Sequence, residues 1–253
     1  MSKINVNTWE PESLQALTMG ASGDTTTVPS GASLVVASGA TINITGATQT
    51  GFPSSGFTSV QTFTSGGTWT KPTDITKVIV EVQGGGGSGA RADMVGPSTA
   101  AVAGGGGGYA KKFLDVSDTT NATVTVGAGG ASQATDNTAG TAGGLSKFEE
   151  NTGTGGWTDV IGNGGAAGTS TSYGMVAGGT ATGGDLNIQG ANGRAGGAEA
   201  KGGDSFFGFA GDTVWLAQVT SDPSRGYGAG GGGGVGLASM AATDGIVIVW
   251  EYK

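Results

Sequence analysis

VIVEVQGGGGSG, at residues 78–89, joins two unlike kinds of sequence. The β-branched residues of 75–83 predict a β-strand. The glycines that follow have no side chain to bury, and glycine loses more backbone entropy on ordering than any other residue. The fold of the chain therefore depends on whether such glycine runs pack against one another or form flexible linkers.

Glycine runs recur through residues 84–236, which hold 45 of the 55 glycines in the 253-residue chain. The longest runs lie at 84–87, 104–108 and 230–234. Aromatic residues, which a Gly-Ser linker would lack, lie among them at Tyr109, Trp157, Phe206 and Trp215. An extended three-fold glycine helix directs its N–H and C=O groups outward, so neighbouring helices can hydrogen-bond to one another. We predict a packed bundle of polyglycine II helices, with a flexible linker as the alternative.

Residues 58–253 are predicted to form a glycine-rich distal domain that combines such helices with β-strands. Besides 75–83, β-branched and aromatic residues predict strands at 111–116, 122–126, 214–219 and 245–252. No stretch of ten or more residues has a convincing helical period. The predicted fold class is therefore all-β and irregular.

Residues 1–57 are predicted to be an N-terminal attachment segment followed by a β-repeat shaft. Small residues repeat at 30–33, 38–41 and 45–48, and short β-prone runs lie between them at 34–36 and 42–44. Each run is too short to bury a face alone, so repeats must stack or identical chains must pair. We expect a short trimeric β shaft; a loosely ordered Ser/Thr/Gly linker is the alternative.

The composition excludes several classes of function. The chain has no His and no Cys, which rules out Ser-His and Cys-His catalysis and zinc sites built on imidazole or thiolate. With 19 acidic against 11 basic residues, it lacks the basic surface that nucleic acid binding requires. No signal-peptide pattern follows Met1, and no apolar run is long enough to span a bilayer. We expect no enzymatic activity and assign no residue to a cofactor or a metal.

Two patterns that could carry chemistry are interpreted as incidental. Residues 84–89 match the dinucleotide pattern G-x-G-x-x-G after a strand, but the helix and the acidic residue that such a site needs do not follow. Carboxylates that could act as a glycosidase pair or bind Ca²⁺ are Glu149, Glu150, Asp204, Asp212 and Asp222. None of them lies in a dense acidic loop, so we interpret them as solvated surface charges.

Several motifs together resemble the glycine-rich domain of bacteriophage tail-fibre and receptor-binding proteins. They are residues 78–89, GGGGGYA at 104–110, TVTVGAGG at 123–130, GYGAGGGGG at 226–234 and DGIVIVWEYK at 244–253. The resemblance covers roughly residues 60–253, and a more remote one is to the polyglycine-helix sandwich of long-tail-fibre adhesins. The resemblance to the tail-fibre domain implies a homotrimeric virion tail fibre, which is assembled in the host cytoplasm and joined to other tail proteins through its N-terminus. Its distal tip would recognise a cell-surface glycan or an outer-membrane protein.

Loops between the glycine segments are the expected recognition elements, because rigid scaffolds present functional residues on loops. The candidate loops are 88–103, 131–142, 166–177 and 204–225. In the last of them, the candidates for receptor contact are Phe206, Phe207, Phe209, Trp215 and Asp212. Exposed aromatic rings are costly unless they meet a partner. In the alternative interpretation, residues 214–219 form a strand under the bundle, which the phenylalanines seal.

Three rival functions differ from receptor recognition. The first is a purely structural fibre component of the virion that touches no receptor. The second is a polyglycine ice-binding protein, which would need a flat face of small residues that the bulky side chains of 204–215 interrupt. The third is a depolymerase, which would need a paired-carboxylate site.

Overall fold

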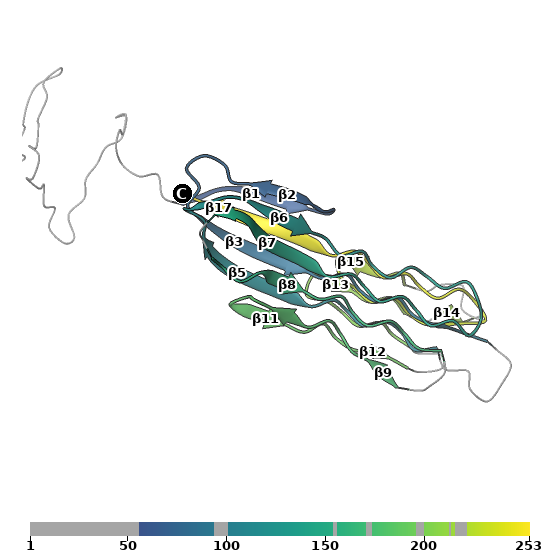
Figure 1. Cartoon of the computed structure of the whole chain (residues 1–253). Helices are drawn as coiled ribbons and strands as arrows, with labels where there is room; N and C mark the ends of the chain where they lie inside the picture. The colour runs from purple at the N-terminus through teal and green to yellow at the C-terminus, as the bar shows by residue number, and fades with distance from the viewer. Residues whose placement is uncertain are drawn as a thin grey trace, which may run out of the picture. The chain divides into compact units, whose positions relative to one another are not determined.

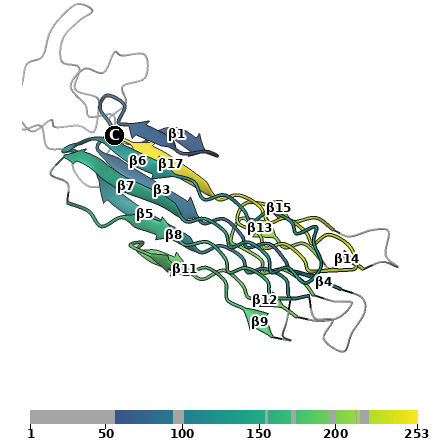
Figure 2. The same cartoon turned by 45° about the vertical axis from the view of Figure 1, so that its right-hand side comes forward.

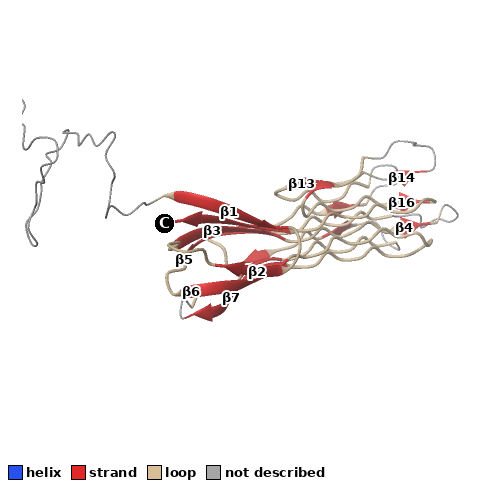
Figure 3. Cartoon of the chain, turned by 90° about the horizontal axis from the view of Figure 1, so that it is seen from above, coloured by secondary structure: helices blue, strands red, loops and turns tan. Residues whose placement is uncertain are grey.

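The computed structural model describes residues 56–93, 101–153, 156–170, 174–195, 200–212, 214–215 and 222–253. The β shaft predicted within residues 1–57 lies almost entirely outside this part, so it stays a prediction. The described residues contain strands and no helix, as Figure 3 shows, which confirms the all-β fold class.

Two five-stranded antiparallel sheets stand at one end of the described part (Figures 1 and 2). The first, sheet A, has the order β1 (Phe57–Phe63), β17 (Ile246–Tyr252), β3 (Lys77–Gln83), β5 (Tyr109–Asp115) and β11 (Leu186–Ile188). The second, sheet B, has the order β10 (Ala181–Thr182), β8 (Val160–Gly162), β7 (Ser146–Gly153), β6 (Thr119–Thr125) and β2 (Gly67–Thr70). The first and the last strand of the described part, β1 and β17, thus lie side by side.

The two sheets enclose one hydrophobic core. Alternate residues of β3 point inward because successive side chains in a strand lie on opposite faces, and Val78, Val80 and Val82 are fully buried. From sheet B, Trp69 and Phe148 are also fully buried, and their rings lie 5.7 Å apart. This core anchors the glycine segments that leave the sheets.

The strand predictions were largely right. The expected strands at 75–83, 111–116, 122–126 and 245–252 are present as β3, β5, β6 and β17, displaced by at most three residues at either end. The strand expected at 214–219 begins as β14 (Val214–Trp215), and residues 216–221 lie outside the described part. Sequence analysis missed β1, β2, β7 and β8.

Beyond the sheets, extended glycine segments run side by side and hydrogen-bond to one another. Residues 84–90 form an inner segment whose N–H groups change partner at every residue and return to the same neighbour after three. The donations run from Gly84 to Gly108, Gly85 to Gly144, Gly86 to Thr243, Gly87 to Gly105, Ser88 to Thr141 and Gly89 to Met240. Its carbonyl groups accept from three further segments, at Gly165, Gly130 and Gly231. The glycine segments are therefore packed and do not form a flexible linker.

Residues 102–108 form a second inner segment with the same three-residue rotation. Their N–H groups donate in turn to segments 163–169, 191–194 and 228–231. A side chain would not fit here: a Cβ on Gly104 would lie 1.9 Å from the carbonyl oxygen of Gly87. Because backbone lies against backbone on every side, glycine is required by space at these positions.

Small two- and three-stranded sheets complete the bundle. Two antiparallel pairs are β9 (Met175–Val176) with β12 (Gly193–Arg194), and β13 (Gly208–Phe209) with β15 (Arg225–Gly226). A parallel sheet joins β14, β16 (Gly234–Val235) and β4 (Arg91–Ala92). In Figure 3 this parallel sheet stands at the end of the bundle opposite the five-stranded sheets.

Candidate functional site

The end of the bundle farthest from the five-stranded sheets is held by a small apolar cluster. The inner segment 84–90 continues into β4, which pairs with β16 in parallel. Ala92, Ala101 and Val235 are buried together there. The pairing of β4 with β16 and this apolar cluster therefore hold in place the loops that connect the glycine segments at this end.

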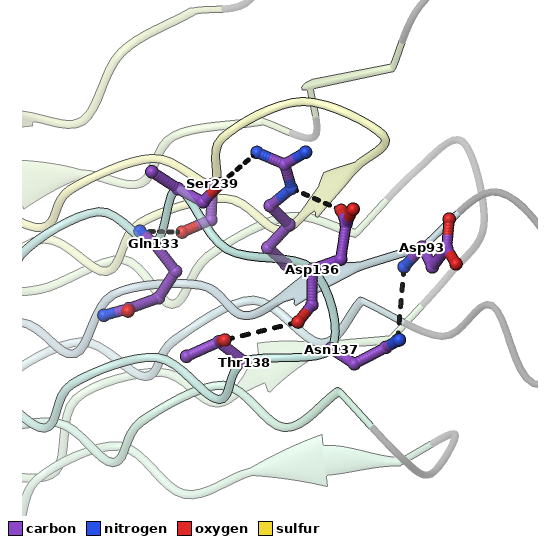
Figure 4. A network of polar contacts seen from close by, with 8 residues as sticks. Asp93, Gln133, Asp136, Asn137, Thr138 and Ser239 are labelled. Carbon is purple, nitrogen blue, oxygen red and sulfur yellow. Dashed lines mark hydrogen bonds and ion pairs between the residues drawn. The ribbon is translucent and has the colours of Figure 1, made fainter.

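One of these segments, residues 131–139, is tied down by polar contacts (Figure 4). Arg91 Nε lies 2.7 Å from Asp136 Oδ1, and the Arg91 guanidinium also donates to the carbonyl oxygen of Ala134. The backbone N–H of Gln133 donates to Ser239 Oγ over 2.9 Å. These contacts hold a polar loop in one conformation, which lowers the entropy lost when such a loop binds a ligand.

Asn137 shapes the same loop. Its φ of 55° places it in the left-handed region, which asparagine tolerates better than most residues. Its Oδ1 accepts a hydrogen bond from the backbone N–H of Asp93 over 3.3 Å. The loop was among the predicted recognition segments, although neither Arg91 nor Asn137 was singled out from the sequence.

Two of the predicted receptor-binding residues lie elsewhere, at the junction between sheet A and the bundle. Phe206 stacks on Tyr109 with a centroid distance of 4.0 Å, and Phe207 meets the same ring edge-on at 5.4 Å. Tyr109 is buried, whereas Phe206 remains half exposed. The phenylalanines therefore cover Tyr109 of sheet A. The alternative, in which they seal a strand at 214–219, concerns residues that lie mostly outside the described part and stays a prediction.

The Tyr109 hydroxyl connects this aromatic cluster to Glu81. It donates to Glu81 Oε1 over 2.6 Å, Trp250 Nε1 donates to Oε2 over 2.8 Å, and Lys111 Nζ lies 3.4 Å away. Burial alone would raise the pKa of Glu81, but the hydrogen bonds from Tyr109 and Trp250 and the charge of Lys111 outweigh it and lower the pKa. Burial, and then the bond to Glu81, raise the pKa of Tyr109. The Glu81 carboxylate is therefore charged, and Tyr109, Trp250 and Lys111 compensate that charge within an otherwise apolar surface.

The remaining predicted residues do not join this cluster. Phe209 is 75% exposed. Asp212 is exposed and lies beside Gly232 in the bundle, away from the Tyr109 junction. The backbone of Trp215 lies in β14, and its side chain is outside the described part. Tyr109, the centre of the cluster, was not predicted as a site residue from the sequence. Its position directly after the glycine run 104–108, where the chain enters sheet A, is the feature that could have identified it.

A groove of about 500 Å³ opens on the flank of the bundle. It is lined by Met175, Ala191, Asn192, Arg194, Lys201, Gly202 and Asp204. The Lys201 ammonium lies 3.7 Å from the Asp204 carboxylate, and both side chains are about half exposed. Its amide, guanidinium and carboxylate groups can hydrogen-bond to sugar hydroxyls.

The carboxylates weighed as catalytic pairs are dispersed over separate contacts. Glu149 pairs with Lys147 at 2.6 Å, Asp222 with Arg225 at 3.3 Å, and Asp204 accepts from the N–H of Ala210. In the described ranges no three acidic side chains gather as a metal site. Residues 84–89, which match the dinucleotide pattern, are buried in the bundle, where the close backbone leaves no space for a nucleotide.

The predicted loops are shorter than expected. Residues 88–90 and 101–103, expected within one loop, belong to the two inner segments, and 140–142 and 166–170 also belong to packed segments. The error arose because single Ser, Ala and Val residues interrupt the glycine pattern without interrupting the backbone hydrogen bonding.

Comparison with known proteins identifies the glycine-rich region. The model of a glycine-rich domain family matches residues 58–250. No curated protein matches the chain. Nowhere in the described residues is there a helix long and apolar enough to cross a membrane.

Proposed function

Because the chain belongs to the glycine-rich domain family, we propose that it is a bacteriophage tail-fibre protein that attaches to the host cell by non-catalytic recognition. It assembles as a homotrimer within the virion, joins other tail proteins through residues 1–57, and binds a cell-surface glycan or outer-membrane protein. The tail-fibre assignment rests on the combination of motifs given above, and the arrangement of the bundle supports it.

The glycine segments act in this proposal as polyglycine II helices. The three-residue return of hydrogen-bond partners along 84–90 supports this, because polyglycine II has three residues per turn. A helix of this kind has no internal hydrogen bonds, so its stability comes from its neighbours. The bundle is then a rigid spacer between the sheets and the loops at its far end.

The proposal rests on which end of the domain is joined to the preceding residues and which end is free. The chain enters at Gly56, which exchanges hydrogen bonds of 3.3 and 3.1 Å with the C-terminal residue Lys253. Both lie at the sheet end, whereas the 131–139 loop lies at the other end of the bundle. A fibre attached through its N-terminal residues would therefore present the 131–139 loop outward. Three copies per fibre would add weak contacts by avidity.

The test is adsorption of labelled full-length protein to a panel of bacterial strains. Thr135→Trp adds bulk at the exposed tip of the 131–139 loop, and Thr73→Trp is the matched control in an exposed turn at the sheet end. We expect Thr135→Trp to abolish binding to the strain that the unmodified protein binds, and Thr73→Trp to leave it unchanged. Adsorption to no strain would favour the structural alternative, in which the chain links fibre components without touching a receptor.

A further inference from the structure

The face of sheet A that points away from the hydrophobic core is itself apolar. Residues paired directly across neighbouring strands point to the same face. One such row crosses four strands, with Val60 opposite Trp250, Trp250 opposite Ile79, and Ile79 opposite Phe113. Four large apolar residues therefore stand in line on the outside of the sheet.

Neighbouring rows extend this surface. Phe57 contacts the rings of Trp250 and Tyr252 at 6.1 and 5.9 Å, and Leu186 of β11 lies opposite Lys111. The large apolar residues that are more than two-fifths exposed on this face are Phe57 (58%), Val60 (44%), Phe113 (51%) and Leu186 (48%). Phe206 extends the face toward the bundle by stacking on Tyr109. We call these residues, with Ile79, Trp250 and Tyr252, the outer face.

The buried carboxylate on this face is compensated within the chain. Glu81 is almost completely buried and is satisfied by Tyr109, Trp250 and Lys111. A partner is therefore not needed to neutralise it. The other charged side chains on this side of the sheet, Lys77 and Asp115, lie directly opposite each other on β3 and β5, at the end of these strands away from the bundle. An identical surface brought against the outer face would therefore meet mainly apolar side chains along the Val60–Phe113 row.

The size of the outer face suits an interface. Four strands of seven residues, at about 3.3 Å per residue and about 4.8 Å between strands, span roughly 23 by 19 Å in projection. The accessible surface of a face studded with side chains exceeds its projection. The projection is roughly 440 Å², to which the side-chain relief adds, and one partner buries about 800 Å² in a specific complex.

The position at which the preceding residues join the domain indicates which partner covers this face. The 55 residues before Gly56 lead directly into β1, whose first residue, Phe57, belongs to the outer face. If identical chains associate through those residues, as the proposed trimer requires, the copies of β1, and with them Phe57 of the outer face, are held close to one another. We propose that the outer face is buried against other copies of this chain in the fibre. This inference rests on the homotrimer within the proposed function.

Because the chain contains no cysteine, single introduced thiols can test the contact in the full-length protein. Val60→Cys, Phe113→Cys and Leu186→Cys each place a thiol on the outer face. Leu145→Cys is the matched control, because Leu145 is 45% exposed and precedes β7 in sheet B. A short flexible bis-maleimide should cross-link outer-face variants into covalent dimers, whereas Leu145→Cys should stay at the background of the unmodified protein.

Light scattering on the same samples separates the possible failures. The unmodified chain should have about three times the monomer mass of 24.3 kDa. A trimeric mass with background cross-linking at all three outer-face positions would overturn the inference and leave the proposed trimer standing. That is also the result expected if residues 1–55 of the same chain cover the face. A monomeric mass would overturn both. Equal cross-linking at Leu145 and on the outer face would mark the reaction as non-specific and would also count against the inference.

A charge variant gives a second readout. Phe113→Lys together with Leu186→Lys would place like charges in the contact, whereas Leu145→Lys adds the same charge elsewhere. We expect the double variant to lower the cross-linking of Val60→Cys to background and the Leu145→Lys change to leave it intact. Undiminished cross-linking in the double variant would contradict the proposed contact.

Discussion

Tyr109 and Glu81 share a 2.6 Å hydrogen bond, and this bond joins the first residue after the glycine run 104–108 to the middle of sheet A. Because the pKa of Glu81 lies below its usual value of about 4.5, the charged carboxylate is stabilised by folding. A group of this kind stabilises the fold above its unfolded-state pKa. That stabilisation is lost as the pH falls through the lower folded-state pKa.

Glu81→Gln should therefore lower the free energy of unfolding at about pH 7 by about 1–3 kcal/mol, since Trp250 Nε1 and Lys111 lose their carboxylate. The difference from the unmodified protein should begin to shrink as the pH falls below about 4.5, the usual pKa at which the unfolded chain protonates Glu81, and should be lost as the pH falls through the lower folded-state pKa. Urea unfolding at several pH values measures both effects. Glu149→Gln, at a carboxylate that is 41% exposed, is the control and should change stability by less than about 1 kcal/mol. A pH-independent loss in Glu81→Gln would contradict the assigned charge state.

The glycine bundle predicts a strong penalty for any side chain in its interior. A Cβ on Gly106 would lie 2.3 Å from the carbonyl oxygen of Asp204 and 2.7 Å from that of Gly203, both backbone atoms that cannot move independently. Gly106→Val should destabilise the protein by more than about 2 kcal/mol. Gly174→Ala, at a glycine with nothing within 4 Å of its added Cβ, should be neutral within about 1 kcal/mol. Thermal unfolding compares the two, and an equal melting temperature for both variants would refute the packed interior.

The sequence was sufficient for the strands that carry β-branched side chains and insufficient for those that do not. β3 and β17 are rich in valine and isoleucine, so their pattern identifies them. β7 reads SKFEENTG and has Phe148 as its single large apolar residue, so its strand state depends on pairing with β6 and β8. Local sequence does not contain that information.

Which glycine segment lies beside which could not be predicted from the sequence, for a related reason. Packing partners are normally encoded by complementary side chains, and glycine has none. Gly85, Gly86 and Gly87 are chemically identical, yet they donate to Gly144, Thr243 and Gly105, three different segments. The same limitation applies to the aromatic cluster at Tyr109: Phe206 and Phe207 are visible in the sequence, but their stacking on Tyr109 depends on how the segments pack.

Gln83 marks the point where sheet becomes bundle, and its loss should be measurable. Its side chain is fully buried, and Nε2 donates to the carbonyl oxygens of Gly107 and Gly108 over 2.9 and 3.1 Å. Gln83→Met keeps the volume and also removes Oε1, which is buried without a hydrogen-bond partner, but the lost donor leaves the carbonyl oxygens of both Gly107 and Gly108 without this partner. We expect a loss of about 1–3 kcal/mol in the free energy of unfolding.

The matched control for this substitution is Gln189→Met. Gln189 donates to the carbonyl oxygen of Gly178 over 3.2 Å, but its side chain is exposed, so water can replace the bond. Its loss should be below about 0.5 kcal/mol. Chemical denaturation gives both values, and equal losses for the two glutamines would show that the buried donation is not what stabilises the junction.

Two tryptophans that contact Phe148 allow the hydrogen bond of a buried indole to be separated from its packing. The rings of Trp69 and Trp157 lie 5.7 and 5.9 Å from that of Phe148. Trp69 Nε1 donates to Glu251 Oε1 over 2.7 Å, and Glu251 is 1% exposed. Trp157 Nε1 is buried without a hydrogen-bond partner.

Substitution by phenylalanine should therefore have unequal costs at the two positions. Trp69→Phe removes ring volume and also one of the donors to the buried Glu251 carboxyl group, whereas Trp157→Phe removes similar volume and relieves an unsatisfied N–H. Because a lost hydrogen bond to a buried acidic group costs about 1.5–3 kcal/mol, Trp69→Phe should be the more destabilising change by about that amount. Urea unfolding of the two variants, with m-values compared to confirm equal exposed surface, gives the difference directly. Equal destabilisation would mean that Glu251 gains nothing from the indole and that packing on Phe148 accounts for both tryptophans.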